Sequence, residues 1–497
     1  MSVLAGLQPE KVFKYFEEIC GIPHGSRDTK RISDYLAKFA ADRGLRHIQD
    51  AGGNVIIFKD ASTGYENSDP VILQGHMDMV CEKDEDCDID FSKDGLRLRL
   101  DGNIISAEGT TLGGDDGIAL AYCLAILDAP KDEIPHPPLE VVFTVDEEIG
   151  MFGAADIDCS MLKGRTFLNI DSEEEGKLLV SCAGGISAVT HIPLTYCDLK
   201  EQESFGDGKI LKIRVNGISG GHSGVEIHKE GANSNKVMGR ILYNLSKDFD
   251  FRLIEVNGGL KDNAIPRDTT ALLYIGSKDI DAVGERLNAM KKTLSSEYRA
   301  TDKDINITWE GDAANSSIQI LEKNVTAKVI TALVNLPNGI QKLSKDIEGL
   351  VQTSLNLGIA KTIKDDNGID EFICTFSIRS SVSTEKEEIV EKITCLMNAI
   401  GGTVTTSGDY PAWEYKEDSK LRNTMIDVYE SMYGEKPEIQ AIHAGLECGL
   451  FAGKLPGLDC VSYGPQMDDI HTTQERLHVD SAIRTWEFTL EVLKRLK

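Results

Sequence analysis

Hydrophobic and polar positions in the first part of the chain follow two periods, one typical of helices and one typical of strands. Apolar residues recur at helical spacing over residues 9–20 and again over about 28–43. Residues 54–58 and 70–75 are short apolar runs separated by a turn-rich segment, which predicts two strands. Residues 109–127 then combine a glycine-rich turn with an apolar helix. Helices that alternate with strands in this way are typical of an α/β fold with a mostly parallel sheet.

The pattern changes twice more along the chain. A middle segment carries more lysine and glutamate among its strands and helices, including a long helix near 281–299, and it predicts an α+β insertion. Beyond it, a helix at 418–433 restores the α/β character. We therefore expect a discontinuous domain of residues 1–186 and 408–497, interrupted by an inserted domain of residues 187–407.

Composition limits the class of protein. A chain of 497 residues is longer than one hydrophobic core normally serves, which agrees with two domains. Its 81 acidic residues outnumber 53 lysines and arginines, and the net charge of -28 argues against nucleic acid or an anionic membrane as a partner. The amino-terminal segment has no signal-peptide pattern, and eleven cysteines without a C-x-x-C pair suit free thiols. We expect a cytoplasmic protein.

The first candidate for chemistry follows the strand predicted at 70–75. His76 and Asp78 come at its carboxyl end, and side chains two residues apart on a strand point the same way. A metal-bound imidazole usually gives its second N–H to an oxygen acceptor, so Asp78 could orient His76. The plainer interpretation is a satisfied histidine beside a solvated acid.

Acidic residues also follow other turns and strands. Asp115 and Asp116 lie in the turn GGDDG, where such residues more commonly cap a helix. The turn lacks the lysine of a P-loop, and its two carboxylates suit a metal better than a phosphate. Glu147 and Glu148 follow the strand VVFTVD; neighbouring side chains in extended backbone point apart, so one can bind metal while the other faces a water.

Two more residues complete the set of candidate ligands. Asp171 follows the strand TFLNI, and His471 lies in YGPQMDDIHTTQERL near the end of the chain. Either residue alone is as easily explained by the protein surface. Together with the strand-end acids and His76 they make a site with hard oxygens and two imidazoles, which suits paired zinc, manganese or cobalt ions.

At this point the sequence resembles the M20 metallopeptidases, and within them the bacterial aminoacyl-histidine dipeptidases, also called Xaa-His or carnosinase-like dipeptidases. The resemblance runs nearly end to end. It rests on eight motifs in this order: GHMDMV, GGDDGIALA, VDEEIG, FLNIDSEEEG, GGHSGVEIH, NAIPRD, HAGLECG and YGPQMDDIHTTQERL. It implies that the discontinuous domain is a zinc-peptidase-like catalytic domain and that the insertion is a lid and dimerisation domain.

The resemblance also implies a role for each residue of the metal site. Asp115 would bridge two metal ions, of which one is completed by His76 and Asp171 and the other by Glu148 and His471. Glu147 would be the general base, and Asp78 would orient His76. The chain departs from many relatives at Asp116, where they have asparagine. The peptide between Asp115 and Asp116 is expected to be cis.

In the insertion, the resemblance implies three residues that bind substrate. His222 of GGHSG would be the lid histidine that stabilises the oxyanion, which dimeric members supply across subunits, so we expect a homodimer. Its alternative is a histidine that packs in a glycine turn. Asn263 and Arg379 would contact the free carboxylate of the substrate. His443 and Glu447 of the HAGLECG motif could belong either to the pocket or to the core.

The sequence thus predicts a di-metal hydrolase, with zinc as the first choice of ion and manganese or cobalt as alternatives. Its substrates would be dipeptides with a free carboxyl end, including Xaa-His peptides such as β-Ala-His. Two alternatives stay open. One is an M20 amidohydrolase that acts on N-acyl amino acids, and the other is a catalytically silent metal-binding scaffold, against which the presence of Glu147 beside a full ligand set weighs.

Overall fold

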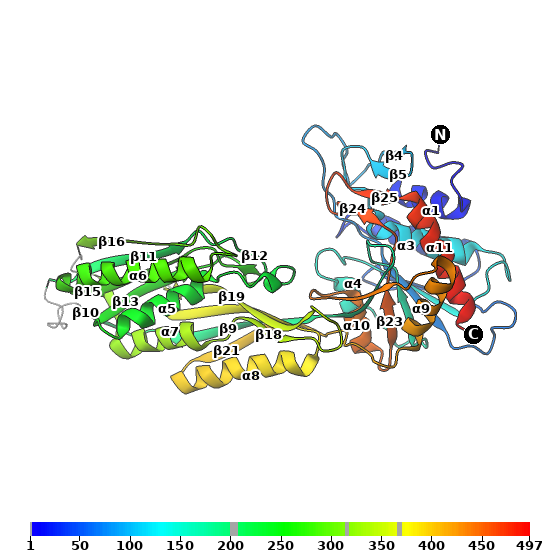
Figure 1. Cartoon of the computed structure of the whole chain (residues 1–497). Helices are drawn as coiled ribbons and strands as arrows, with labels where there is room; N and C mark the ends of the chain where they lie inside the picture. Colours follow the sequence, from blue (N-terminus) through cyan, green and yellow to red (C-terminus); the bar gives the residue numbers. More distant parts are fainter. Residues whose placement is uncertain (1, 199–206, 314–317, 365–369) are drawn as a thin grey trace. The chain divides into compact units, whose positions relative to one another are not determined.

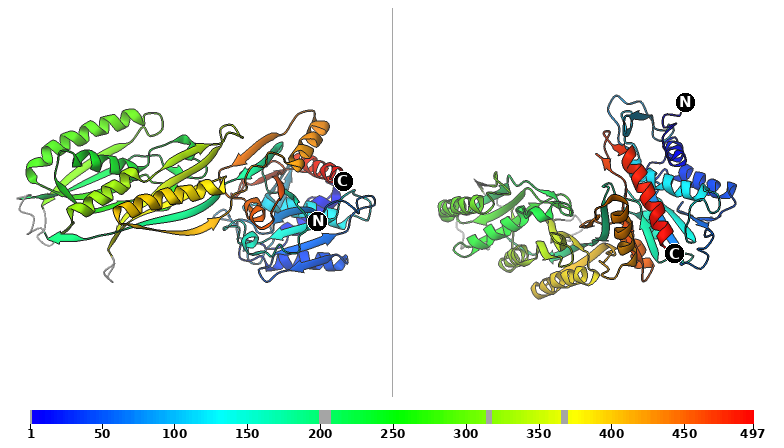
Figure 2. Two further views of the ribbon diagram at one scale, coloured as in Figure 1. Left: turned by 90° about the horizontal axis from the view of Figure 1, so that it is seen from below. Right: turned by 45° about the vertical axis from the view of Figure 1, so that its right-hand side comes forward.

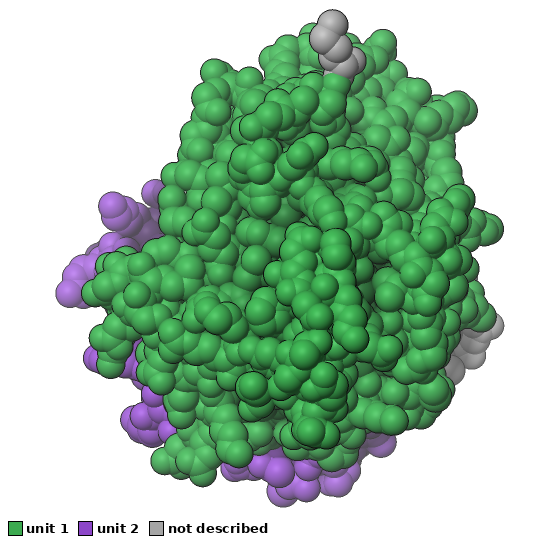
Figure 3. Space-filling view, turned by 90° about the vertical axis from the view of Figure 1, so that its right-hand side faces the viewer, with its two compact units in different colours: residues 1–182, 413–442, 446–497 green, residues 183–412, 443–445 purple. Residues whose placement is uncertain are grey.

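The chain forms two compact units in a computed structural model that describes residues 2–198, 207–313, 318–364 and 370–497. Unit 1 comprises Met1–Cys182, Trp413–Ile442 and Leu446–Lys497, and unit 2 comprises Ala183–Ala412 with His443–Gly445 (Figures 1 and 3). The expected domain bounds at 186 and 408 differ from these by a few residues. The return of three residues, 443–445, to unit 2 was not expected.

Unit 1 alternates helices with strands along the chain. Its helices are α1 (Glu10–Cys20), α2 (Lys30–Asp42), α3 (Gly114–Asp128), α4 (Phe152–Asp156), α9 (Lys420–Tyr433), α10 (Glu447–Lys454) and α11 (Val479–Arg495). Its strands are β1 (Arg46–Gln49), β2 (Val55–Lys59), β3 (Val71–His76), β4 (Leu98–Asp101), β5 (Ile104–Ala107), β6 (Leu139–Thr144), β7 (Thr166–Asn169), β8 (Lys177–Cys182), β22 (Glu438–Ile442), β23 (Asp459–Ser462), β24 (Met467–Asp468) and β25 (Arg476–His478).

The main sheet of unit 1 has the order β1-β2-β6-β3-β7-β23-β8-β22 in the described residues. Its central strands β6, β3, β7 and β23 run parallel, whereas β1, β2 and β6 pair antiparallel and so do β23 and β8. The α/β fold predicted from the alternation is therefore confirmed, with a sheet that is parallel at its centre. Parallel strands end at the same edge, so the residues that follow β6, β3 and β7 are brought together there.

Helices cover both faces of this sheet. Ile72 of β3 shares a core cluster with Ala154 of α4 and Phe451 of α10, which places these helices on one face. The position of Gly75 faces the other side of the sheet. A Cβ atom placed on Gly75 would lie 2.9 Å from the Cβ of Ala119 in α3. Helix α11 lies on the same side as α3, as Figure 2 shows. The absence of a side chain at Gly75 lets α3 approach β3 just before His76.

A smaller sheet of unit 1 has the order β24-β25-β5-β4. The loop that carries His471 joins β24 to β25, so this sheet holds the late histidine of the sequence motif. In the same unit, Tyr122 of α3 donates a hydrogen bond of 2.6 Å to the carbonyl of Ala482 in α11, which ties the last helix to the helix that follows the Asp115 turn.

Unit 2 has the α+β character expected of the insertion. Its helices are α5 (Ser234–Ser246), α6 (Ile280–Glu297), α7 (Lys323–Asn335) and α8 (Ser383–Ile400). Its strands are β9 (Gly184–Pro193), β10 (Tyr196–Asp198), β11 (Lys209–Asn216), β12 (Gly221–His222), β13 (Phe251–Gly258), β14 (Ala264–Ile265), β15 (Thr269–Ile275), β16 (Asn306–Ala313), β17 (Gln319–Leu321), β18 (Gly339–Leu343), β19 (Val351–Ile363), β20 (Glu371–Ser380) and β21 (Thr403–Tyr410).

An antiparallel sheet with the order β16-β11-β15-β13-β19-β20-β9-β21 forms the frame of unit 2. Helices α5 to α8 share one core with it, built for example from Met238, Leu287, Leu333 and Ile393 (Figure 1). A two-stranded ladder of β12 and β14 pairs His222 with Ala264. Within the described residues, no helix has both the length and the apolar character needed to cross a bilayer. All eleven cysteines are free thiols.

Candidate functional site

Five of the predicted residues converge at the carboxyl edge of the unit 1 sheet. His76 ends β3, Glu148 follows β6 and Asp171 follows β7, and these strands are neighbours in the order β6-β3-β7. Asp115 lies at the start of α3. His471 comes from the loop between β24 and β25. Its backbone has a left-handed φ of 61°, which few residues other than glycine adopt. Such backbone strain persists where the surroundings enforce it.

These five side chains form two groups that share Asp115. His76, Asp115 and Asp171 make one group, and Asp115, Glu148 and His471 make the other; within each group the ligand atoms lie within 4.8 Å of one another. The Asp115 carboxylate has one oxygen 3.0 Å from Nε2 of His76 and the other 3.1 Å from Nε2 of His471. Imidazole and carboxylate are the donors that zinc and similar ions take, so the residues fit two divalent cations.

The start of α3 distinguishes between the interpretations of the GGDDG turn. Neither aspartate caps the helix with its side chain, and the N-cap position is Gly113 with a φ of 65°. Instead the Glu475 carboxylate accepts hydrogen bonds from the N–H groups of Leu112 and Gly114, each of 2.8 Å. Asp115 is therefore free to face the two histidines. The Asp115–Asp116 peptide is cis, as the resemblance implied.

Asp116 has a different environment from Asp115. It is buried, and its Oδ2 accepts a hydrogen bond of 3.2 Å from the backbone N–H of His76. Burial raises its pKa well above the ordinary value, and the carboxylate of Asp171 adds to the rise. The raised pKa favours the neutral form of Asp116, and a neutral group is what the asparagine of many relatives would present.

Asp78 supports more of the site than the sequence predicts. The Nδ1 of His76 lies 3.0 Å from the backbone carbonyl of Asp78 and 3.6 Å from its carboxylate, and because a carbonyl only accepts, Nδ1 carries a proton. The Asp78 carboxylate also accepts hydrogen bonds from the backbone N–H of Glu147 at 2.9 Å and from the hydroxyl of Ser26 at 2.8 Å. One acid thus orients His76 and holds the turn that presents the two glutamates.

The two adjacent glutamates have different surroundings. Oε1 of Glu148 lies 2.9 Å from Nε2 of His471, inside the second group. Glu147 belongs to neither group. Burial raises the pKa of Glu147 to about 9, with further contributions from the carboxylates of Asp171 and Glu447. Cations bound in the two groups would oppose this rise, since positive charge favours a carboxylate.

The two histidines of the ligand groups both have raised pKa values. Hydrogen bonds to Asp115 and Glu148 raise the pKa of His471 to about 10. For His76, burial lowers the pKa, but the carboxylates of Asp171 and Asp115 outweigh burial and hold it well above the ordinary value. A metal ion requires the neutral imidazole, so cations and protons compete for the same nitrogen atoms.

A buried polar network lies beneath the centre and settles where Glu447 belongs. Glu447 is fully buried at the start of α10, and its Oε2 accepts hydrogen bonds from Gln74 and from Thr144, the latter of 2.8 Å. Gln74 in turn accepts a hydrogen bond of 2.6 Å from Asn169. These contacts join α10 to β3, β6 and β7, so Glu447 is part of the core of unit 1.

The three predicted substrate residues all belong to unit 2. Nδ1 of His222 accepts hydrogen bonds from the N–H groups of Gly224 at 3.2 Å and Val225 at 3.3 Å, so the proton of the neutral ring is on Nε2. Burial and the charge of Arg379 lower the pKa of His222, which favours the neutral ring. His222 therefore combines the turn-packing role of the plainer interpretation with a free donor atom. The backbone carbonyl of Asn263 accepts a hydrogen bond of 2.9 Å from Ser223, next to His222.

Arg379 has neighbours that the sequence did not indicate. Its Nη1 lies 3.2 Å from the hydroxyl of Tyr410, and on the adjacent strand its partner is Ser354. Ser354 lies 2.8 Å from Nε2 of His443, one of the three residues that return to unit 2. Burial, together with the charge of Arg379, lowers the pKa of His443 to about 4. Unit 2 thus groups a guanidinium, a neutral imidazole and hydroxyl groups.

The supporting residues carried no local signal in the sequence. Ser26 and Glu475 contact segments that are distant in the sequence. Ser26 donates to the carboxylate of Asp78, and Glu475 accepts from the backbone before Asp115. In the sequence, Gln74 looks like an ordinary strand residue. The HAGLECG motif did single out His443, without indicating whether it faces a pocket.

The chain belongs to peptidase family M20/M25/M40, whose family model matches residues 72–495. It is 35% identical to the cytosol non-specific dipeptidase of Escherichia coli (strain K12) over 497 residues, which cover 100% of this chain and 99% of that protein. The M20 family predicted from the motifs is therefore confirmed, and with it the class of hydrolase.

Solved structures agree with this relationship. The aminoacylhistidine dipeptidase from Vibrio alginolyticus superposes with a TM-score of 0.90 at 35% identity, over 99% of this chain and 97% of that one. The aminopeptidase PepT from Bacillus cereus shares the fold at 17% identity, with a TM-score of 0.58 over 99% of both chains.

We predict that the metal-free chain takes up two divalent ions and releases protons as it does so. At pH 7.5 His471, whose pKa is raised to about 10, holds an extra proton. The pKa of His76 is raised as well, so metal affinity should rise with pH. Calorimetry with Zn²⁺ in buffers of different ionisation enthalpy, with elemental analysis, measures both quantities. His471→Ala should bind about one ion and release fewer protons; His478→Ala, outside the two groups, is the matched control. Uptake of one ion by the unaltered chain would contradict the prediction.

Proposed function

We propose that this chain is a di-metal dipeptidase that hydrolyses dipeptides with a free carboxyl end. The observation that carries the proposal is the pair of three-residue groups that share Asp115, with Glu147 beside them and outside both. Two relatives that match over nearly the whole chain are named as dipeptidases, one of them non-specific and one acting on aminoacylhistidine.

In this proposal His76, Asp171 and Asp115 would hold one ion, and Glu148, His471 and Asp115 would hold the other. The ions are zinc, with manganese or cobalt as alternatives, because this mixture of imidazole and carboxylate serves all three. Bound divalent ions would supply Lewis-acid chemistry toward the scissile carbonyl and an attacking water.

Glu147 moves the proton. It is half-buried on the turn held by Asp78, so its carboxylate has a defined direction and little water around it. It accepts a proton from the attacking water and delivers it to the leaving amine, as a general base and then a general acid. Asp78 acts indirectly, through the tautomer of His76 and through the backbone of Glu147.

The residues of unit 2 bind the rest of the substrate. His222 offers its Nε2–H to the carbonyl oxygen, where negative charge develops during attack. Arg379 and Asn263 receive the free carboxylate, for which a guanidinium fork is well suited. We also propose a cytoplasmic homodimer in which His222 acts in the site of the partner; the acidic composition and the name of the Escherichia coli relative support the location.

A comparison of three substrate classes tests the reaction. The metal-loaded protein should hydrolyse ordinary dipeptides and β-Ala-His, and it should leave N-acetyl amino acids intact or nearly so. The ratio of kcat/KM for Ala-His to that for Ala-Leu measures any preference for histidine. Faster turnover of N-acetyl amino acids would instead identify an amidohydrolase, and no turnover of any substrate with each metal would leave a silent scaffold.

Separate replacement of the adjacent glutamates tests the proton transfer. Glu147→Ala should keep both metal ions and lose about 10²- to 10⁴-fold or more in kcat, because general acid–base catalysis is removed while the ligands stay. Glu148→Ala should lose metal from the group that contains His471. Metal content, substrate binding and kcat are measured on the same preparations, with Glu174→Ala at the surface as the control. Metal loss in Glu147→Ala with retention in Glu148→Ala would reverse the two roles.

Mixed dimers test the role of His222. Glu147→Ala and His222→Ala chains should each be inactive, and mixing them should restore activity because a hybrid dimer then contains one intact site. Mixing Glu147→Ala with Glu148→Ala is the matched control, since each of its sites keeps one lesion. If tagged subunits exchange and activity stays absent in the first mixture, His222 does not act across subunits.

A further inference from the structure

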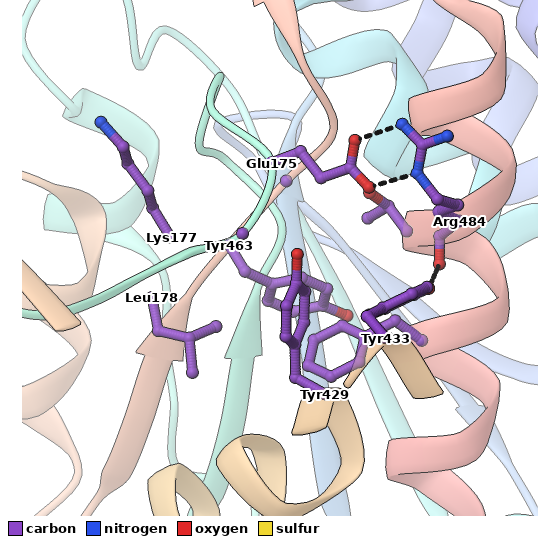
Figure 4. Close-up of a pocket in the computed structure, with 11 residues that line it drawn as sticks. Glu175, Lys177, Leu178, Tyr429, Tyr433, Tyr463 and Arg484 are labelled. Carbon is purple, nitrogen blue, oxygen red and sulfur yellow. Dashed lines mark hydrogen bonds and ion pairs between the residues drawn. The ribbon is translucent and has the colours of Figure 1, made fainter. Parts of the chain in front are cut away.

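Three glutamates, Glu173 to Glu175, follow Asp171 and Ser172, and among the described residues only Glu173 of these three forms no ion pair. Glu174 forms an ion pair with Lys177. Glu175 forms a two-pronged ion pair with Arg484, with both N–O distances 2.6 Å, beside the tyrosines of a small pocket (Figure 4). Glu173 has no such contact in that part of the chain, although it is more buried than Glu174. A half-buried carboxylate without a positively charged partner is less favourable than one that a cation meets.

The main chain around Glu173 is held tightly. The hydroxyl of Ser172 lies 2.8 Å from that of Ser462, and a Cβ on Gly464 would lie 1.8 Å from the Ser172 carbonyl, so the two backbones are in contact. The carbonyl of Glu173 itself accepts a hydrogen bond of 2.8 Å from Met467. These contacts restrain the backbone on both sides of Glu173.

The same contacts put Glu173 beside the metal centre. Asp171 precedes it by two residues, and the sulfur of Met467 lies 3.1 Å from where a Cβ on Gly114 would be, next to Asp115. The carboxylates of Asp115 and Asp171 and the imidazole of His471 lie close enough to interact electrostatically with the Glu173 carboxylate. Glu173 nevertheless belongs to neither ligand group. Glu173 is therefore an acid beside the centre that is not one of the candidate metal ligands.

The other acids near the centre are occupied. Asp78 accepts hydrogen bonds from Ser26 and from the backbone of Glu147, and Glu475 accepts them from the turn before Asp115. Asp116 and Glu447 are buried beneath the site and are less than 2% exposed. With Glu147 assigned to proton transfer, Glu173 is the remaining carboxylate that a cation from outside could meet.

We propose that Glu173 binds the free ammonium group of the first residue of the dipeptide and so selects peptides with an unblocked amino end. This inference rests on the proposed function. In a dipeptide the α-nitrogen is two covalent bonds, about 2.5 Å, from the scissile carbonyl carbon, so its binding group must lie beside the centre. A carboxylate there forms a charge-assisted hydrogen bond with an ammonium group. An N-acylated substrate has no such group and gains nothing from Glu173.

A matched pair of ligands isolates the amino group. Ala-His and propionyl-His differ only in the α-ammonium, and a Glu147→Gln background prevents turnover while binding is measured by calorimetry on the metal-loaded protein. Adding Glu173→Gln should weaken the binding of Ala-His by about 10- to 100-fold, the range for one hydrogen bond to a charged group. The affinity for propionyl-His should not change. Glu174→Gln, the paired neighbour at the surface, should change neither. Both variants should keep two metal ions.

Each other result overturns the inference. Loss of a metal ion from Glu173→Gln would show that Glu173 is a metal ligand. Equally weakened binding of both compounds would show that its role is structural. An unchanged affinity for Ala-His would show that another group binds the ammonium. Turnover of Ala-His by the chain with Glu147 intact tests the proposed function separately. If that turnover is absent while Glu173→Gln still removes the preference for Ala-His over propionyl-His, the proposed function fails and the assignment of Glu173 stands.

Discussion

The carboxylate of Asp115 lies between two imidazoles, 3.0 Å from His76 and 3.1 Å from His471, and much of unit 1 is arranged around this contact. Asp115 is only 8% exposed, and burying a carboxylate is costly unless opposite charge and hydrogen-bond donors compensate it. The compensation comes from two other parts of the fold, which are the end of the central strand β3 with His76 and the loop between β24 and β25 with His471.

Residues around this contact act mainly through the backbone. Asp78 restrains the turn of Glu147, and Glu475 restrains the turn before Asp115. Glu447 ties α10 to the sheet from below. Because the ligands are set by the main chain, their positions depend on contacts that are not themselves part of the chemistry. A metal site held in this way has less freedom to rearrange when ions or substrate enter.

The centre alone does not distinguish a peptide from an acylated amino acid, since the same metal chemistry would cleave either bond. Discrimination has to come from groups that meet the two charged ends of a dipeptide. In the proposed function Arg379 binds the carboxylate end; its charge, together with burial, also lowers the pKa of His443 to about 4. In the further proposal Glu173 binds the ammonium end. These two proposed roles give one group of each sign, as a zwitterionic substrate requires.

The sequence by itself determined the elements and the types of residue in the site. Strand periodicity placed His76, Glu148 and Asp171 after strands, and long motifs indicated the M20 family, which the family match confirmed. Both signals are local, because they depend on spacing over a few residues. The capping alternative for Asp115 could not be rejected at that level, since a cap and a metal ligand have the same local sequence. Only the tertiary structure brought His471 to Asp115 across 356 residues, assigned Glu447 to the core and moved His443–Gly445 to unit 2. These outcomes depend on which strands become neighbours and on which donors approach each carboxylate, and contacts between distant segments leave no periodic trace in the chain.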